Sequence, residues 1–227
     1  MAETLPQNIP IPTAAAIASF NFFDISEGTG IISFYGVSHR ESSSASYYLT
    51  SNTNTYSSTV VASGAFVTGS STGQILSANF DIKFNRSQNL KGYAYMNFSF
   101  GGTGTTGTGT PSIFISGGSI SNNTTGTTLA SLGNLSNQAI DLSSPVLGSY
   151  SKGLNVRFDL TGGPYHFAPG DTLRLNLQVW GTCSGTAPIT YGGIGIDPQG
   201  RADPDDLTIQ TTNTTKMILN LPFLNNQ

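Results

Sequence analysis

Apolar and polar residues alternate along most of this chain, and a period of two is typical of β-strands with one buried face and one wet face. The apolar positions of the clearest runs are Phe80, Ile82 and Phe84; Ala94, Met96, Phe98 and Phe100; Leu154, Val156, Phe158 and Leu160; Leu173, Leu175, Leu177 and Val179; and Met217, Leu219, Leu221 and Phe223. Two further runs, 20–26 and 31–37, flank the turn Glu27–Gly30 and predict a hairpin. With weaker runs at 45–50, 57–67, 111–120, 138–142, 187–196 and 207–210, the pattern predicts roughly ten to twelve strands.

These runs predict an all-β fold, because no window carries the apolar spacing of a long amphipathic helix. We expect antiparallel strands, since parallel neighbours need crossovers of about a dozen residues or more, usually helical. A single two-sheet sandwich of jelly-roll type, over residues 19–227, packs many short antiparallel strands with few exposed edges. The alternative is a smaller sandwich followed by a second β-domain that begins near residue 110.

The first 18 residues are expected to form an extended N-terminal arm. Pro6, Pro10 and Pro12 each remove a backbone donor and hold the preceding residue in an extended conformation. These three prolines are therefore candidates for contacts with a partner.

Two tracts of short polar residues, 101–110 and 122–128, interrupt the alternation. Their side chains cannot build a core, so we expect mobile hairpin tips or partner contacts. The segment Ala168–Asp171 predicts a type II turn, because Pro169 presets φ at the first central position and Gly170 supplies positive φ at the second.

Charge is scarce in this chain. Only 21 of the 227 residues are Asp, Glu, Lys or Arg, whereas Ser, Thr, Asn and Gly together number 101. In a soluble domain about a quarter of the residues are usually charged. This composition therefore suits a surface that contacts a binding partner, or a chain that belongs to an assembly. The net charge of −3 gives no electrostatic footprint for nucleic acid.

The single cysteine and the N-terminal residues indicate in which cellular compartment the protein is made. A single cysteine, Cys183, excludes an internal disulfide framework. The N-terminus lacks the basic and apolar regions of a secretory signal, and no stretch reaches the roughly 18 apolar residues of a membrane span. We therefore expect synthesis in a cytoplasm, without export by the general secretory route and without a membrane partner.

Three segments resemble catalytic motifs, and none has the required context. The glycine pattern at 102–107 and the elbow-like segment 181–185 around Cys183 are each followed by an expected strand, where their mechanisms need a helix. His39 and Glu41 resemble half of a zinc-deaminase motif, whose cysteine pair this chain lacks. We expect neither enzymatic activity nor a cofactor.

One acidic cluster lies late in the chain. Calcium prefers oxygen ligands, and Asp197, Asp203, Asp205 and Asp206 are its candidate ligands. A plain solvated loop is the favoured interpretation, because the spacing matches no EF-hand and Arg201 neutralises part of the charge.

Aromatic residues on the polar faces are the other candidates. Tyr93 and Tyr95 alternate with the apolar residues of their strand, and Trp180 lies near the end of another. Exposed tyrosines stack on sugar rings or anchor protein interfaces. They could equally face a second sheet, and the sequence leaves these interpretations open.

Both ends of the chain resemble β-sandwich proteins encoded among the structural genes of tailed viruses. The matching segments are Phe22–Gly30 with Phe34–Gly36, and Gly195–Pro198 with Thr214–Phe223. The resemblance implies a late virion protein, such as a capsid decoration protein or an accessory shell or tail component, without catalytic residues.

The first hypothesis is therefore a non-enzymatic virion structural protein, assembled in the host cytoplasm. It would bind viral capsid or tail proteins, stabilise their lattice and form a homo-oligomer, with a trimer as the expected state. The alternative is a carbohydrate-binding module or receptor-binding adhesin whose exposed aromatics contact a glycan.

Overall fold

A computed structural model gives the fold and describes residues 18–19, 29–41, 44–63, 71–104, 108–142, 149–186, 188–202 and 213–224. The strands in chain order are β1 (Ala18–Ser19), β2 (Thr29–Glu41), β3 (Ser44–Thr50), β4 (Val60–Ser63), β5 (Ser71–Lys83), β6 (Gln88–Leu90), β7 (Tyr93–Gly104), β8 (Ser112–Ile115), β9 (Ser119–Asn122), β10 (Thr127–Ser131), β11 (Ile140–Asp141), β12 (Ser149–Asp159), β13 (Tyr165–Phe167), β14 (Thr172–Cys183), β15 (Ile189–Gly195) and β16 (Ile218–Leu224). The other regular element in these residues is a 3-10 turn, η1 (Ser136–Gln138). The all-β class is confirmed, and no helix in the described ranges is long and apolar enough to cross a membrane.

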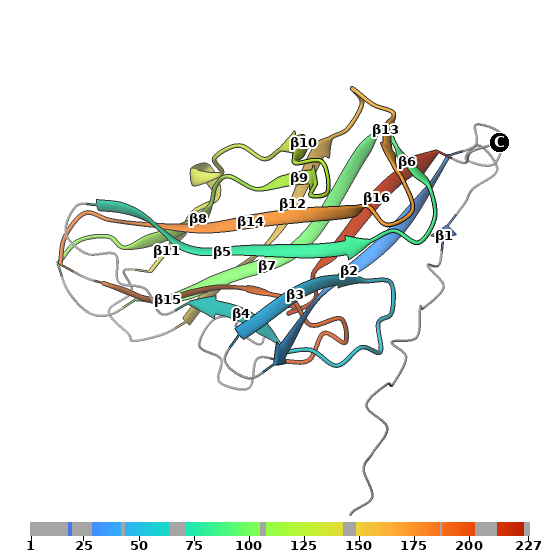
Figure 1. Cartoon of the computed structure of the whole chain (residues 1–227). Helices are drawn as coiled ribbons and strands as arrows, with labels where there is room; N and C mark the ends of the chain where they lie inside the picture. The colour runs from blue at the N-terminus through green and yellow to red at the C-terminus, as the bar shows by residue number, and fades with distance from the viewer. Residues whose placement is uncertain are drawn as a thin grey trace, which may run out of the picture.

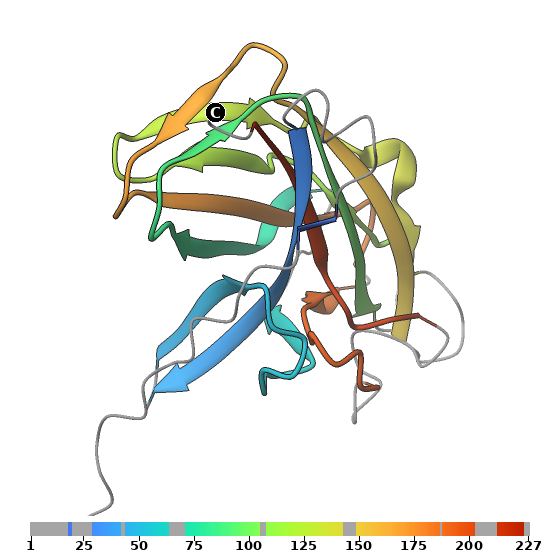
Figure 2. The same cartoon turned by 90° about the vertical axis from the view of Figure 1, so that its right-hand side faces the viewer.

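The described strands form one hydrogen-bonded network with the main path β10-β9-β14-β5-β3-β2-β16-β7-β15-β4. β12 pairs with β7 along its whole length. The network bends, so that β14 and β5 lie on one side of the molecule and β7, β12 and β16 on the other (Figure 1, Figure 2).

The expectation of purely antiparallel strands is wrong at one pairing. β3 runs parallel to β5, with Tyr47 opposite Phe80 and Tyr48 opposite Asp81. The crossover that a parallel pair requires is the connection between β3 and β5, and its described part carries β4. Because β3 also pairs antiparallel with β2, it joins the two sides into one mixed sheet.

A single core cluster fills the space between the two sides. On β14, Leu173, Leu175, Leu177 and Val179 are fully buried, and the residues between them are partly exposed. β12 and β16 show the same alternation, as the sequence predicts, and β7 shows it up to Phe98, beyond which nearly every residue is buried. Burying such side chains contributes about 1.5–3 kcal/mol each, so the regular alternation holds the two sides together.

The first low-complexity tract is not the expected hairpin tip over its described first half. Residues 101–104 belong to β7, which pairs here with β12 on one side and β15 on the other. A Cβ on Gly102 would lie 2.5 Å from the Tyr191 carbonyl oxygen and 2.9 Å from Ile113 Cδ1. β7 therefore requires glycine at position 102 because a side chain would clash there, and not because the backbone must be flexible.

Other local predictions have mixed outcomes. The second tract does form the β9–β10 hairpin, where the Asn122 side chain accepts hydrogen bonds from the N–H groups of Thr124 and Thr125. The type II turn is supported, with Gly170 at φ 96° and an Asp171 N–H bond to the Ala168 carbonyl.

The N-terminal predictions are only partly described. Thr29 and Gly30 lie in β2 and not in the predicted turn, and residues 20–28 lie outside the described residues. Residues 18–19, at the end of the expected arm, pair with Ile31 and Ile32 of β2. Pro6, Pro10 and Pro12 lie outside the described ranges, so the arm stays a prediction.

Candidate functional site

The first candidate surface is the outward side of four neighbouring strands, which we call the tyrosine face. Its residues are Ile31, Ser33 and Tyr35 on β2; Tyr93, Tyr95 and Asn97 on β7; Asn155, Arg157 and Asp159 on β12; and Ile218, Asn220 and Pro222 on β16. The register brings these residues to one side, because Tyr95 lies opposite both Arg157 and Asn220. Both predicted tyrosines therefore share one surface.

The tyrosine face combines exposed rings with few charges. Tyr93 is 41% exposed, Tyr95 48% and Ile31 45%. The Arg157 guanidinium lies 4.5 Å from the centre of the Tyr93 ring, a cation–π contact. The Ser33 hydroxyl donates to Asn220 Oδ1 at 2.7 Å. This face offers apolar area bordered by amides and hydroxyls, with charged side chains on β12 and with the Lys216 ammonium 5.9 Å from the centre of the Tyr35 ring.

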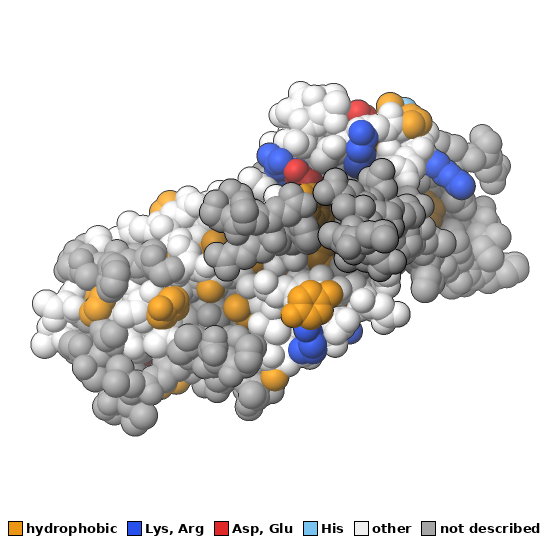
Figure 3. Space-filling model, turned by 60° about the horizontal axis from the view of Figure 1, so that its bottom comes forward, with side chains coloured by type: hydrophobic (Ala, Val, Ile, Leu, Met, Phe, Trp, Pro, Cys, Tyr) orange, Lys and Arg blue, Asp and Glu red, His pale blue; other side chains and the backbone are white. Residues whose placement is uncertain are grey.

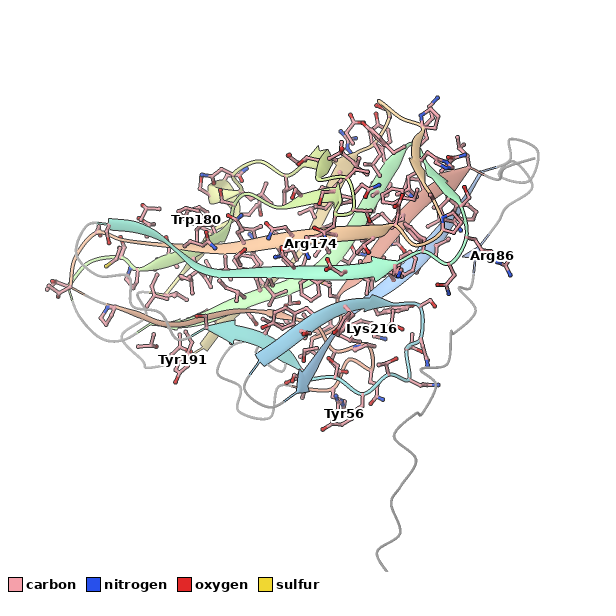
Figure 4. All side chains as sticks on the ribbon, viewed as in Figure 1. Tyr56, Arg86, Arg174, Trp180, Tyr191 and Lys216 are labelled. Carbon is pink, nitrogen blue, oxygen red and sulfur yellow. The ribbon has the colours of Figure 1, made fainter. Side chains whose placement is uncertain are left out.

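The second candidate surface lies on the other side of the molecule, and we call it the amide face. Its residues are Ser46 and Tyr48 on β3; Ser77, Asn79 and Asp81 on β5; and Arg174, Asn176, Gln178 and Trp180 on β14. Figure 4 shows Arg174 and Trp180 at successive places along β14. All of these residues occupy polar positions of the alternating runs.

A chain of hydrogen bonds fixes the amide face. The Trp180 Nε1–H donates to Gln178 Oε1 at 3.1 Å, and Gln178 Nε2 donates to Asn176 Oδ1 at 3.1 Å. Asn176 Nδ2 in turn donates to Asn79 Oδ1 at 2.7 Å and to the Ser77 hydroxyl at 3.1 Å. Each amide in this chain therefore has a defined orientation.

An ion pair extends the same row. Arg174 binds Asp81 through two parallel bonds, from Nε and Nη2 to the two carboxylate oxygens, each 2.7 Å long. The hydrogen bond to Asp81 raises the pKa of Arg174 above its ordinary value, against the effect of burial. The paired charges cancel locally, and the bidentate geometry holds both side chains in place.

A polar groove opens where β3 meets β5 and β14. It has a volume of about 350 Å³ and is lined by Ser46, Tyr47, Tyr48, Ser77, Asn79, Asp81 and Arg174. Tyr47 turns its ring against Phe80 in the core, with ring centres 5.5 Å apart, whereas Tyr48 is 45% exposed. The groove thus has a rigid floor of amides and ions and a tyrosine at its side.

Asp197, a candidate calcium ligand, is already occupied by protein donors. Its carboxylate is fully buried and accepts bonds from Arg201 Nε at 2.8 Å and from the N–H groups of Gln199 and Arg201. Arg201 also reaches the Ser57 carbonyl at 2.5 Å and lies over the Tyr56 ring. Asp203, Asp205 and Asp206 lie outside the described residues, and the described ranges contain no cluster of three metal-ligating side chains.

The catalytic resemblances have the surroundings that the sequence predicts. Cys183 is buried at the end of β14, and the next regular element is strand β15. The glycine pattern at 102–107 is likewise followed by strand β8. His166 lies on β13, where it contacts Asn89 at 2.8 Å, and the His39 side chain lies outside the described part.

Sequence reasoning did not find the groove. Its residues come from three separate strands, and the parallel register of β3 on β5 brings Tyr48 next to Asp81. The available signal was the opposite charge of Asp81 and Arg174 at polar positions of two strong runs. Pairing these runs requires knowledge of which strands are neighbours.

Comparisons with known proteins add little. No protein-family model matches the chain, and no curated protein matches it. Two crystal structures of a CocE/NonD family hydrolase from Staphylococcus aureus are similar at TM-scores of 0.29 and 0.20, with 10% and 11% sequence identity. The matches cover 85% and 84% of this chain but 36% and 39% of the hydrolase, so the chain spans well under half of its length.

Proposed function

We propose that this chain is a non-enzymatic virion structural protein, a capsid decoration protein or an accessory shell or tail component. The observation that carries the proposal is the tyrosine face, where Tyr93, Tyr95 and Ile31 are exposed on a broad surface of hydroxyls and amides. Protein interfaces are enriched in tyrosine and arginine and depleted of other charged residues at their centres. This face has that composition.

The sparse charge supports dense packing of many copies. Only 21 of the 227 residues are charged, and on the side of the molecule in Figure 3 isolated hydrophobic side chains lie among polar ones, with the charged side chains mostly toward the upper right. Copies placed side by side then repel one another little. A subunit that binds only the assembled lattice stabilises that state by mass action. We propose self-association of the same kind, with a trimer as the expected form.

We also propose that the bent sheet is a two-sheet sandwich of jelly-roll type. Its two sides enclose one core, as the sheets of a sandwich do. In this proposal the short parallel contact of β3 with β5 connects the edges of the two sheets.

The proposal is tested by co-sedimentation with particles of the virus that encodes the chain. Wild-type protein is expected to sediment with the particles, and Tyr95→Ser is expected to weaken binding about tenfold or more, as for a central interface tyrosine. Tyr48→Ser is the matched control, because Tyr48 is 45% exposed and lies on the amide face. Free wild-type protein beside fully sedimented particles would reject the proposal.

The alternative, a carbohydrate-binding module or adhesin, uses the same two tyrosines differently. It predicts glycan-array signals that disappear in Tyr95→Ala. The lattice proposal predicts that Tyr95→Ala changes particle binding and leaves any glycan signal intact.

A further inference from the structure

The polar groove of the amide face has the chemistry of a small-ligand site and is independent of the proposed lattice contact. Its volume of about 350 Å³ is at the lower end of the range for ligand sites, roughly 300–1,000 Å³. Most such sites are apolar. This groove is lined by hydroxyl, amide, carboxylate and guanidinium groups, so its ligand must itself be polar.

The balance of charge decides which polar ligand fits. A phosphate or carboxylate would be attracted by Arg174 and repelled by Asp81, which lies 2.7 Å from it in a bidentate pair. A neutral ligand meets no such conflict. Hydroxyl groups both donate and accept, so neighbouring hydroxyls can accept from the guanidinium and donate to the carboxylate.

The groove is also preorganised for hydrogen bonding. Asn79 Oδ1 accepts from Asn176, whose own orientation is fixed through Gln178 and Trp180. This contact fixes which end of the Asn79 amide is the oxygen, and Asn79 is one of the residues that line the groove. Binding then requires little ordering of side chains, which lowers the entropic cost.

Tyr48 supplies an exposed aromatic ring at the side of the groove. It lies opposite Asp81 in the parallel register and is 45% exposed, so its ring borders the polar floor. A pyranose ring has hydroxyls around its edge and C–H groups on its faces. A tyrosine ring beside a row of hydrogen-bonding groups matches both surfaces.

We propose that the groove formed by Tyr48, Asn79, Asp81 and Arg174 binds a neutral saccharide, with one pyranose ring in contact with the Tyr48 ring and its hydroxyls on the Asp81–Arg174 pair. The site lies on the side of the molecule away from the tyrosine face. A lattice subunit attached by the tyrosine face would leave this groove open to an external glycan.

The test is saturation-transfer NMR and calorimetry on the full chain with maltose, cellobiose, lactose and N,N′-diacetylchitobiose, and with glucose 6-phosphate as the anionic comparison. At least one neutral disaccharide is expected to bind with a Kd of about 1 mM. Tyr48→Ala and Asp81→Asn are each expected to weaken it about tenfold or more. Tyr191→Ala is the matched control and should bind like wild type.

Several results would overturn the proposal. These are no saturable binding of any neutral disaccharide up to roughly 20 mM, tighter binding of glucose 6-phosphate than of its neutral counterparts, or equal affinity in Tyr48→Ala. Loss of binding in Tyr95→Ala instead would place the glycan on the tyrosine face. If protein partners alone protect the groove in hydrogen exchange, it is a protein interface. Correctly folded variants are identified by a cooperative unfolding transition and an unchanged far-UV circular dichroism spectrum, and none of these outcomes depends on particle binding.

Discussion

The Asp197–Arg201 pair is the buried charge on which the local structure around β15 and the 51–59 loop depends. Arg201→Met would leave the fully buried carboxylate with only its two backbone N–H donors. We expect the free energy of unfolding to fall by about 2 kcal/mol, the cost of a partly unsatisfied buried polar group. Urea denaturation measures this change.

Arg86→Met is the control for this substitution, because Arg86 is exposed and its side chain extends away from the sheet (Figure 4). Its effect should stay within about 0.5 kcal/mol. Equal free energies of unfolding for the two variants would show that Arg201 contributes no more to stability than an exposed arginine does.

Asp159 makes a prediction about pH. The Thr161 hydroxyl and N–H donate to its carboxylate at 2.6 and 2.9 Å, and these bonds hold the pKa of Asp159 below its ordinary value of 3.8, with a smaller effect from Arg157. The stabilisation is therefore present above pH 3.8 and is lost as the pH falls through the lower folded pKa. Thr161→Val should raise the pKa of Asp159 toward 3.8 in a carboxyl-carbon NMR titration. An unchanged midpoint would contradict this account.

At the scale of elements, Ile75 of β5 packs against glycines of two other strands, Gly181 on the paired strand β14 and Gly192 on β15. A Cβ on Gly181 would lie 2.6 Å from Ile189 Cδ1 and 2.7 Å from Ile75 Cδ1, and one on Gly192 would lie 2.9 Å from Ile75 Cγ2. Gly181→Ala is therefore expected to destabilise the protein by about 1–3 kcal/mol through overpacking. Thermal or urea unfolding measures the change.

Two variants make this prediction specific. Gly133→Ala is the control, because a Cβ there meets nothing within 4 Å. Ile75→Val removes Cδ1 and should recover part of the loss when combined with Gly181→Ala, giving a coupling of about 0.5 kcal/mol or more. Additive effects would show that Ile75 and Gly181 do not constrain each other.

The sequence predicted those elements whose alternation is strong. The buried residues of β12, β14, β16 and the first half of β7 are the ones that a period of two selects, because each has one face in the core. The parallel contact of β3 with β5 left no such signal, since it depends on the path of the intervening chain. The same is true of residues 101–104, whose glycines read as flexible but are required by close neighbours.

The candidate sites also differ in whether they depend on local alternation or on the pairing of strands. Alternation on one strand made Tyr93 and Tyr95 candidates but left open whether they face solvent or a second sheet, and both are exposed in the structure. The groove was missed because Tyr48, Asp81 and Arg174 meet only through the pairing of three strands. Local pattern therefore identifies which residues face outward, and topology decides which of them meet.

At the scale of the whole molecule, charge is scarce, since only 21 of the 227 residues are Asp, Glu, Lys or Arg. Two ion pairs, Arg174 with Asp81 and Arg201 with Asp197, cancel part of this charge locally. A surface with few charges exerts weak electrostatic forces on a neighbouring copy. Association through the tyrosine face should consequently change little between about 0.15 and 1 M salt, where exposed ion pairs would be screened.

The central claim is the proposed role as a virion structural protein, and cryo-electron microscopy of the virus particles proposed to contain this chain tests it most directly. The account predicts a repeated density with the shape of this bent sheet, its tyrosine face against the shell or tail and its amide face toward solvent. Particles without such density, together with a chain that stays monomeric in the infected-cell extract, would contradict the assignment as a virion structural protein.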